Sequence, residues 1–131
     1  MKRMRIGRRS GSAATILLAL ALVAVSASPA SADSDKSIVY GSRGYMYFTD
    51  NGDVFKVCDT KADGYGMDGY LNRRNTITGG GFTELWRITA SGNGNCTKKG
   101  EDIGNLYQYQ MSLWWRGNYS DGGTNSDWFN E

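Results

Sequence analysis

A long stretch near the C-terminus alternates between apolar and polar side chains with a period of two. One set of positions within residues 105–116 is Tyr107, Tyr109, Met111, Leu113 and Trp115, and the intervening set is Gln108, Gln110, Ser112 and Trp114. A period of two is typical of a strand with one buried face and is difficult to produce with a helix. We therefore expect a strand that packs its first set of side chains against a core.

Shorter segments rich in strand-forming residues precede this stretch and are separated by turns that contain glycine and asparagine. They are residues 37–40, 44–48, 54–58, 69–74 and 82–90. An Asn-Gly pair within residues 50–53 accepts the positive backbone angles of a tight hairpin. Alternation places Phe55 and Val57 in the core, and in residues 82–90 it places Glu84 on the same face as Trp86.

These patterns predict an all-β fold, either a small antiparallel β-sandwich or a barrel-like domain. The sequence after residue 32 contains no amphipathic helical repeat of useful length. Its 99 residues suit a single domain, so we expect residues 33–131 to fold as one unit. The charged segment 97–104 is expected to be exposed.

The first 32 residues differ in composition and predict a helical signal peptide. Five basic residues and no acidic residue precede a predominantly apolar run at residues 13–25. Ala30 and Ala32 then stand at the small-residue positions that a signal peptidase recognises. A helix over this apolar run extends only about 20 Å, against roughly 30 Å of bilayer hydrocarbon. We expect cleavage near Ala32, secretion and no membrane attachment afterwards, with a twin-arginine route through Arg8-Arg9 as an open alternative.

Removal of this segment changes the charge balance of the chain. The whole sequence has 15 Lys and Arg residues against 13 Asp and Glu residues, a net charge of +2. Without the five N-terminal basic residues, ten basic residues remain against 13 acidic ones, a net charge of −3. A mildly acidic domain lacks the basic surface that nucleic-acid binding requires, so we expect no nucleic-acid partner.

The two cysteines, Cys58 and Cys96, are expected to form a disulfide. Cysteines of an exported chain usually pair, and closing a loop of this length stabilises a domain by roughly 4 kcal/mol in the chain-entropy model. Free thiols or a metal site are the alternatives. The chain has no histidine, and two cysteines alone do not complete a zinc site, so we expect no cofactor.

A distinctive motif surrounds the first cysteine. It reads V-C-D-x-x-A-D-G over residues 57–64 and is followed by Gly66, by Asn95-Cys96 and by residues 102–104. This pattern resembles a group of small secreted actinobacterial proteins that have no assigned activity. The resemblance covers residues 53–104 and implies a compact β domain with a disulfide. Some members of the group carry a further cysteine pair near the C-terminus, where this chain has tryptophans instead.

Two acidic loops are weak calcium candidates. One contains Asp59, Asp63 and Asp68, and the other is residues 50–53. Calcium takes six to eight oxygen ligands, but neither loop follows the spacing of a calcium-binding loop. Asp and Asn also stabilise turns through hydrogen bonds with their own backbone, and we favour this interpretation over a metal site.

The polar face of residues 105–116 is the candidate binding surface. Trp114 shares this face with Gln108, Gln110 and Ser112, whereas Trp115 points to the other side. An exposed indole beside amides suits a sugar, because its ring stacks on C–H groups while the amides bind hydroxyls. The 16 aromatic residues of the chain are also suited to filling a core, and the sequence leaves both interpretations open.

Catalysis receives little support from the sequence, and we expect no enzyme. The lack of histidine excludes Ser–His and Cys–His arrangements, and nothing brings Glu84 close to Glu101 or Asp102 as a carboxylate pair. We expect a non-catalytic binding domain whose partner is an extracellular glycan or protein. Two alternatives are an inhibitor of an extracellular hydrolase, which would present residues 59–68 or 76–83, and a structural protein of the cell envelope.

Overall fold

Eight strands and one short 3-10 helix form in residues 35–78 and 80–131, which are the residues that the computed structural model describes. In chain order they are β1 (Lys36–Tyr40), β2 (Gly44–Thr49), β3 (Val54–Asp59), β4 (Gly66–Asn75), β5 (Thr83–Ser91), β6 (Cys96–Gly100), β7 (Tyr107–Trp115), η1 (Tyr119–Asp121) and β8 (Thr124–Asn125). The all-β prediction is confirmed. The predicted signal peptide and its cleavage site at Ala32 lie outside the described residues.

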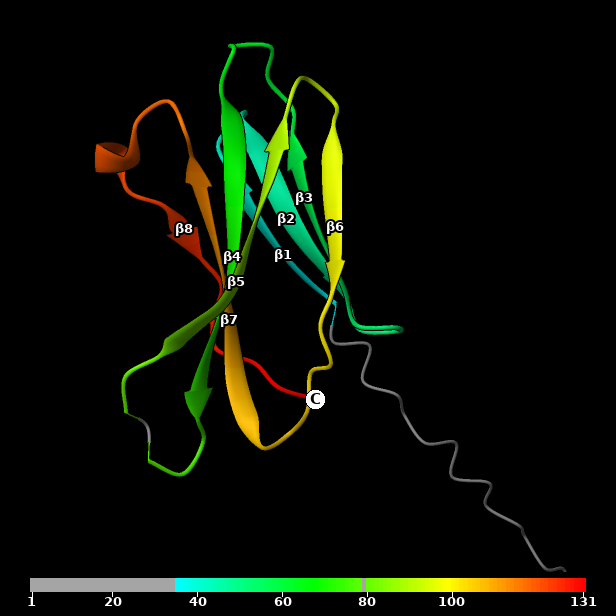
Figure 1. The fold of residues 1–131 in the computed structure, drawn as a ribbon, viewed down its shortest axis with the longest axis vertical. Helices are drawn as coiled ribbons and strands as arrows, with labels where there is room; N and C mark the ends of the chain where they lie inside the picture. The colour runs from blue at the N-terminus through cyan, green and yellow to red at the C-terminus, as the bar shows by residue number, and fades with distance from the viewer. Residues whose placement is uncertain (1–34, 79) are drawn as a thin grey trace, which may run out of the picture. The chain divides into compact units, whose positions relative to one another are not determined.

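The strands form two four-stranded antiparallel sheets that face each other as a sandwich (Figure 1). The first sheet has the order β1-β2-β3-β6, and the second has the order β5-β4-β7-β8. The chain passes from the first sheet to the second between β3 and β4, returns for β6, and then crosses again to β7. Of the two architectures that the sequence predicts, the sandwich is the one that forms.

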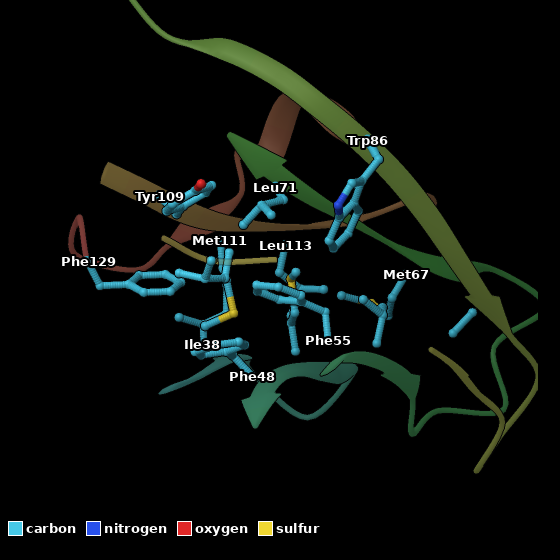
Figure 2. Packing of buried hydrophobic residues seen from close by; sticks show 14 residues of the cluster. Ile38, Phe48, Phe55, Met67, Leu71, Trp86, Tyr109, Met111, Leu113 and Phe129 are labelled. Carbon is cyan, nitrogen blue, oxygen red and sulfur yellow. The ribbon is translucent and has the colours of Figure 1, made fainter. Parts of the chain in front are cut away.

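Side chains from the inner faces of both sheets make up the core (Figure 2). Its fully buried members include Phe48, Phe55, Val57, Met67, Leu71, Met111 and Leu113. The rings of Phe48 and Phe55 stack with their centroids 4.6 Å apart, and Trp86 meets Phe55 edge-on at 5.2 Å. The inward placement predicted for Phe55, Val57 and alternate residues of β7 is confirmed.

Gly69 of β4 allows the two sheets to approach closely in the centre of the sandwich. A Cβ atom at this position would lie 2.2 Å from Cγ2 of Val57 in β3 and 3.2 Å from Sδ of Met46 in β2. Only a residue without a side chain fits here, because any larger residue would push the sheets apart.

The segment 97–104 is largely exposed, as predicted, but it includes a strand and one buried residue. Residues Cys96–Gly100 form β6, which pairs with β3 and exposes Lys98 and Lys99. Beyond this strand Ile103 is fully buried, and its backbone N–H donates to Oδ2 of Asp53 at 3.3 Å. A single apolar residue among charged ones produces no periodic signal, which explains why the sequence pattern does not reveal it.

The predicted disulfide is present between Cys58 and Cys96. The two residues face each other directly in the β3–β6 pair, with their Cα atoms 4.1 Å apart. The bond therefore joins adjacent strands of the first sheet across a sequence separation of 38 residues.

Replacing both cysteines in a Cys58→Ser/Cys96→Ser variant should lower the free energy of unfolding by about 4 kcal/mol, because the unfolded chain regains the entropy of the open loop. Urea unfolding of the oxidised protein, the reduced protein and the variant measures this. Equal stability of the oxidised and reduced proteins would contradict the prediction. Alkylation followed by intact-mass measurement provides the control, since both thiols should react only after reduction.

A Gly69→Ala substitution should destabilise the fold by about 1–3 kcal/mol through overpacking between the sheets. Gly81→Ala is the matched control, because a Cβ atom there meets no other atom within 4 Å. Thermal or urea unfolding of the two variants should show a clear loss for the first and a change within about 0.5 kcal/mol for the second. Similar stabilities for both variants would show that the sheets do not depend on this contact.

Candidate binding site

The outer face of the second sheet carries polar and aromatic side chains in register. Four cross-strand pairs follow one another along β4 and β7, namely Asp68–Trp114, Tyr70–Ser112, Asn72–Gln110 and Arg74–Gln108. Side chains of directly opposed residues on one face are in contact distance, so these pairs form a continuous surface. The same strands direct their other residues into the core.

This surface contains a pocket of about 420 Å³. Its lining residues are Tyr70, Asn72, Phe82, Glu84, Gln110, Ser112, Trp114, Tyr119 and Asn125. Three of the four residues predicted for a binding surface, Gln110, Ser112 and Trp114, therefore line one pocket. The fourth, Gln108, lies outside this lining, where its Oε1 accepts a hydrogen bond from Nε of Arg74 at 2.8 Å.

Glu84 lines the pocket because of a β-bulge between β4 and β5. Leu71 pairs with Trp86, but the next residue, Asn72, pairs with Glu84, so Leu85 is an extra residue. An extra residue in one strand reverses the alternation of side chains beyond it. The prediction that Glu84 shares the face of Trp86 is therefore wrong.

Glu101, one of the two carboxylates considered as a partner of Glu84, lies elsewhere. Oε2 of Glu101 accepts a hydrogen bond at 3.1 Å from Nε1 of Trp86, whose ring belongs to the core. Glu84 lines the outer pocket, so the two carboxylates lie on opposite sides of β5. Glu84 is the only Asp or Glu residue among those that line this pocket.

Hydrogen bonds hold the polar side chains at the base of the pocket. Asn72 and Ser112 are both 6% exposed, and Nδ2 of Asn72 donates to Oγ of Ser112 at 3.0 Å. Nε2 of Gln110 donates to the backbone oxygen of Ser126 at 3.0 Å. These bonds compensate for burial and restrict the side chains to defined positions.

A buried carboxylate supports one wall of the pocket. Asp68 is 2% exposed, and its two oxygens accept hydrogen bonds from the hydroxyl groups of Thr89 and Tyr119, each at 2.5 Å. Nε of Arg116 lies 4.0 Å from the same carboxylate. The hydrogen bond to Asp68 raises the pKa of Tyr119, and partial burial of the phenol contributes in the same direction.

Trp114 is half-buried between this wall and the chain that follows η1. Its ring centroid lies 6.3 Å from that of Tyr119, and a Cβ atom at Gly123 would lie 2.5 Å from the indole. The chain after β7 therefore folds back over the outer face and covers part of a ring that the alternation alone would leave exposed. The remaining part of Trp114 lines the pocket.

Trp115, which the alternation directs inward, is also half-buried and packs against the edge of the core. The guanidinium carbon of Arg43 lies 3.4 Å from the centroid of its ring, and Tyr65 contacts it edge-on at 5.2 Å. This cation–π contact occupies one face of Trp115, which is consistent with a structural role.

The three aspartates of the first calcium candidate do not lie together as one cluster. Oδ1 and Oδ2 of Asp59 accept hydrogen bonds from the backbone N–H groups of Lys61 and Gly92, and Oδ1 of Asp63 accepts one from that of Tyr65. Asp68 lies at the pocket wall. Throughout residues 35–78 and 80–131, no group of three or more His, Cys, Asp and Glu side chains could hold a metal ion.

The second acidic loop, residues 50–53, forms the turn of the β2–β3 hairpin. Positive φ values occur at Gly52 (98°) and Asp53 (52°), one residue later than an Asn-Gly turn would place them. The backbone N–H of Asp53 donates to the backbone oxygen of Asp50 at 3.2 Å. Turn formation accounts for the composition of this loop.

No protein-family model, curated protein or solved structure matches the chain. The resemblance to small secreted actinobacterial proteins therefore stays a prediction. In the part of the chain that the structure describes, no helix is long and apolar enough to cross a membrane.

Sequence patterns did not identify several residues of the pocket. Tyr70 and Leu71 are adjacent in β4, and the structure places Leu71 in the core and Tyr70 in the pocket. Tyr119 and Asn125 come from segments without a periodic pattern, and Phe82 lies beyond the bulge that reverses the alternation of residues 82–90.

A Tyr119→Phe substitution should lower the free energy of unfolding by about 1 kcal/mol at pH 7, because buried Asp68 loses a hydrogen-bond donor. The pKa of Tyr119 is higher in the folded state than its unfolded value of ~10. The stabilisation of the fold by the Tyr119–Asp68 hydrogen bond is therefore complete below that pH and is lost as the pH rises through the folded pKa. Urea unfolding at neutral and strongly alkaline pH should thus show a difference between wild type and variant that disappears at alkaline pH.

Tyr45→Phe is the matched control for this measurement, because Tyr45 is a half-buried tyrosine of β2 in the other sheet. A difference spectrum of tyrosine ionisation between wild type and Tyr119→Phe should show a phenol whose pKa lies above the usual tyrosine value of ~10. An ordinary titration of that phenol, or a stability difference that is independent of pH, would contradict the assigned hydrogen bond.

Proposed function

We propose that this protein is a secreted, non-catalytic binding domain that holds a neutral glycan in the pocket on the outer face of the second sheet. The observation that carries the proposal is the composition of the pocket. Four aromatic residues, three amides, one serine and one carboxylate line it, and neither Lys nor Arg is among the lining residues.

This composition matches the chemistry of a sugar. Each sugar ring has apolar C–H faces, which stack on aromatic rings, and a periphery of hydroxyl groups, which require both hydrogen-bond donors and acceptors. Tyr70, Phe82 and Trp114 supply rings, while Asn72 and Gln110 belong to the amides. A volume of about 420 Å³ falls in the range of small-molecule pockets, which combine apolar walls with a few polar groups.

The charge of the pocket favours a neutral ligand over an acidic one. Phosphate and carboxylate ligands are usually held by Arg or Lys, and the lining contains neither. A single lining carboxylate, Glu84, also favours binding over hydrolysis, because glycosidases generally use two carboxylates on either side of the scissile bond.

Secretion is the second part of the proposal. The N-terminal segment has the composition of a signal peptide, and the disulfide between Cys58 and Cys96 is typical of oxidising compartments. An extracellular domain of this kind would bind polysaccharides of a cell wall or of the surroundings.

Substitution of Tyr70 tests the pocket directly. A pull-down with insoluble cellulose, chitin, xylan and cell-wall peptidoglycan should retain the wild-type domain on at least one of them, and Tyr70→Ala should weaken that retention about tenfold, the size of one lost aromatic contact. Trp114→Ala should abolish retention, with circular dichroism to confirm that it folds.

Tyr45→Ala provides the control, since it removes a half-buried tyrosine from the other sheet. Its retention should equal that of the wild type. The proposal fails if no polysaccharide retains the wild-type domain, or if Tyr70→Ala and Tyr45→Ala are retained equally.

A second candidate function, inhibition of an extracellular hydrolase, is supported by one exposed apolar side chain. Ile77 is 92% exposed after β4, and its backbone N–H donates to Oδ1 of Asn75 at 2.8 Å. Inhibitors commonly insert such a side chain into an active-site pocket. Assays against secreted proteases and amylases test this, with Ile77→Asp as the variant that should lose inhibition; a uniformly negative panel would exclude it.

A further inference from the structure

A second aromatic group lies next to the pocket on the same face. Phe82 lines the pocket and is 62% exposed, and its ring centroid lies 6.3 Å from that of Trp128. Phe82 thus belongs both to the pocket and to a pair of rings that continues beyond it.

The chain fixes Trp128 on the outer side of the second sheet. Its neighbour Phe129 is buried, and the backbones of Phe129 and Tyr109 exchange two hydrogen bonds of 2.7 and 2.8 Å. Successive residues of an extended chain point to opposite sides, so Trp128 points away from the core. The guanidinium carbon of Arg74 lies 4.2 Å from the centroid of its ring, and Arg74 is in turn bound to Gln108.

The Trp114–Tyr119 pair and the Phe82–Trp128 pair stand at opposite ends of one row of side chains. Trp114 is paired with Asp68, and Trp128 lies over Arg74, six residues further along β4. Six residues of a strand extend about 20 Å. One sugar ring is far shorter than this distance, so a single sugar cannot stack on both aromatic groups at once.

The surface between the two groups is polar and suits the middle of a chain. Asn72 and Gln110 face each other there, and both line the pocket. Amides between two stacking positions can bind the hydroxyl groups of sugar units that join the stacked ones.

We propose that the ligand is an oligosaccharide chain of several units that lies along β4 and β7, with Phe82 and Trp128 as a second stacking subsite. This inference rests on the proposed glycan binding of the pocket and adds the ligand's length and direction. Trp114 and Tyr119 form one end of the site, and the Phe82–Trp128 pair forms the other end.

Isothermal titration with oligosaccharides of one to six units from cellulose, chitin, xylan and amylose tests the inference. Affinity should rise with length beyond two units and level off once the chain reaches Trp128. In Trp128→Ala, affinity for the longest chain should fall about tenfold, the contribution of one aromatic contact, and affinity for the two-unit ligand should stay unchanged.

Phe82→Ala provides an independent variant, because an exposed side chain can be removed with little effect on folding. It should also weaken binding of long chains. Equal affinity for two-unit and six-unit ligands, together with unchanged long-chain binding in Trp128→Ala, would overturn the second subsite and leave glycan binding by the pocket intact. Binding of none of these ligands by the wild-type domain would overturn both.

Discussion

The close contact between Gly69 of β4 and Val57 of β3 is the constraint on which the rest of the structure depends. It brings the two sheets together where a Cβ atom could not fit, with Leu71 directed into the same core. Because side chains of a strand alternate, this orientation of β4 necessarily turns Tyr70 and Asn72 outward. A slip of one residue would invert both faces, so the packing of the core also determines the composition of the pocket.

Buried polar groups on an outer sheet face require cover, and the C-terminal part of the chain provides it. Asp68 and Ser112 are nearly inaccessible although they point away from the core, because the segment containing η1 and β8 folds back beside β7 (Figure 1). Burial of such groups is costly unless each has a partner, and both have hydrogen bonds. These hydrogen bonds consequently hold the pocket in shape, which would lower the entropic cost of binding a ligand there.

Sequence patterns predicted those features of the fold that depend on residues close together in the sequence or on the number of cysteines. The period of two in β7, the turn at residues 50–53 and the pairing of Cys58 with Cys96 all have signals in neighbouring residues or in the cysteine count, and the structure contains all three. The position of Glu84 and the burial of Ile103 depend on a bulge and on a packing site formed by distant segments. Neither leaves a periodic trace, because both depend on how strands that are distant in the sequence pair and pack.

The same reasoning explains why aromatic content alone could not distinguish a core from a binding surface. Inside the sandwich the rings are mainly phenylalanines, which have no polar atom to satisfy, as with Phe48 and Phe55 in Figure 2. Tyr70 and Trp114 carry a polar atom at one end, and they line the pocket with part of each ring in contact with water. Apolar area left in water beside fixed amides is unfavourable in the free domain, and a ligand that covers it recovers that free energy on binding.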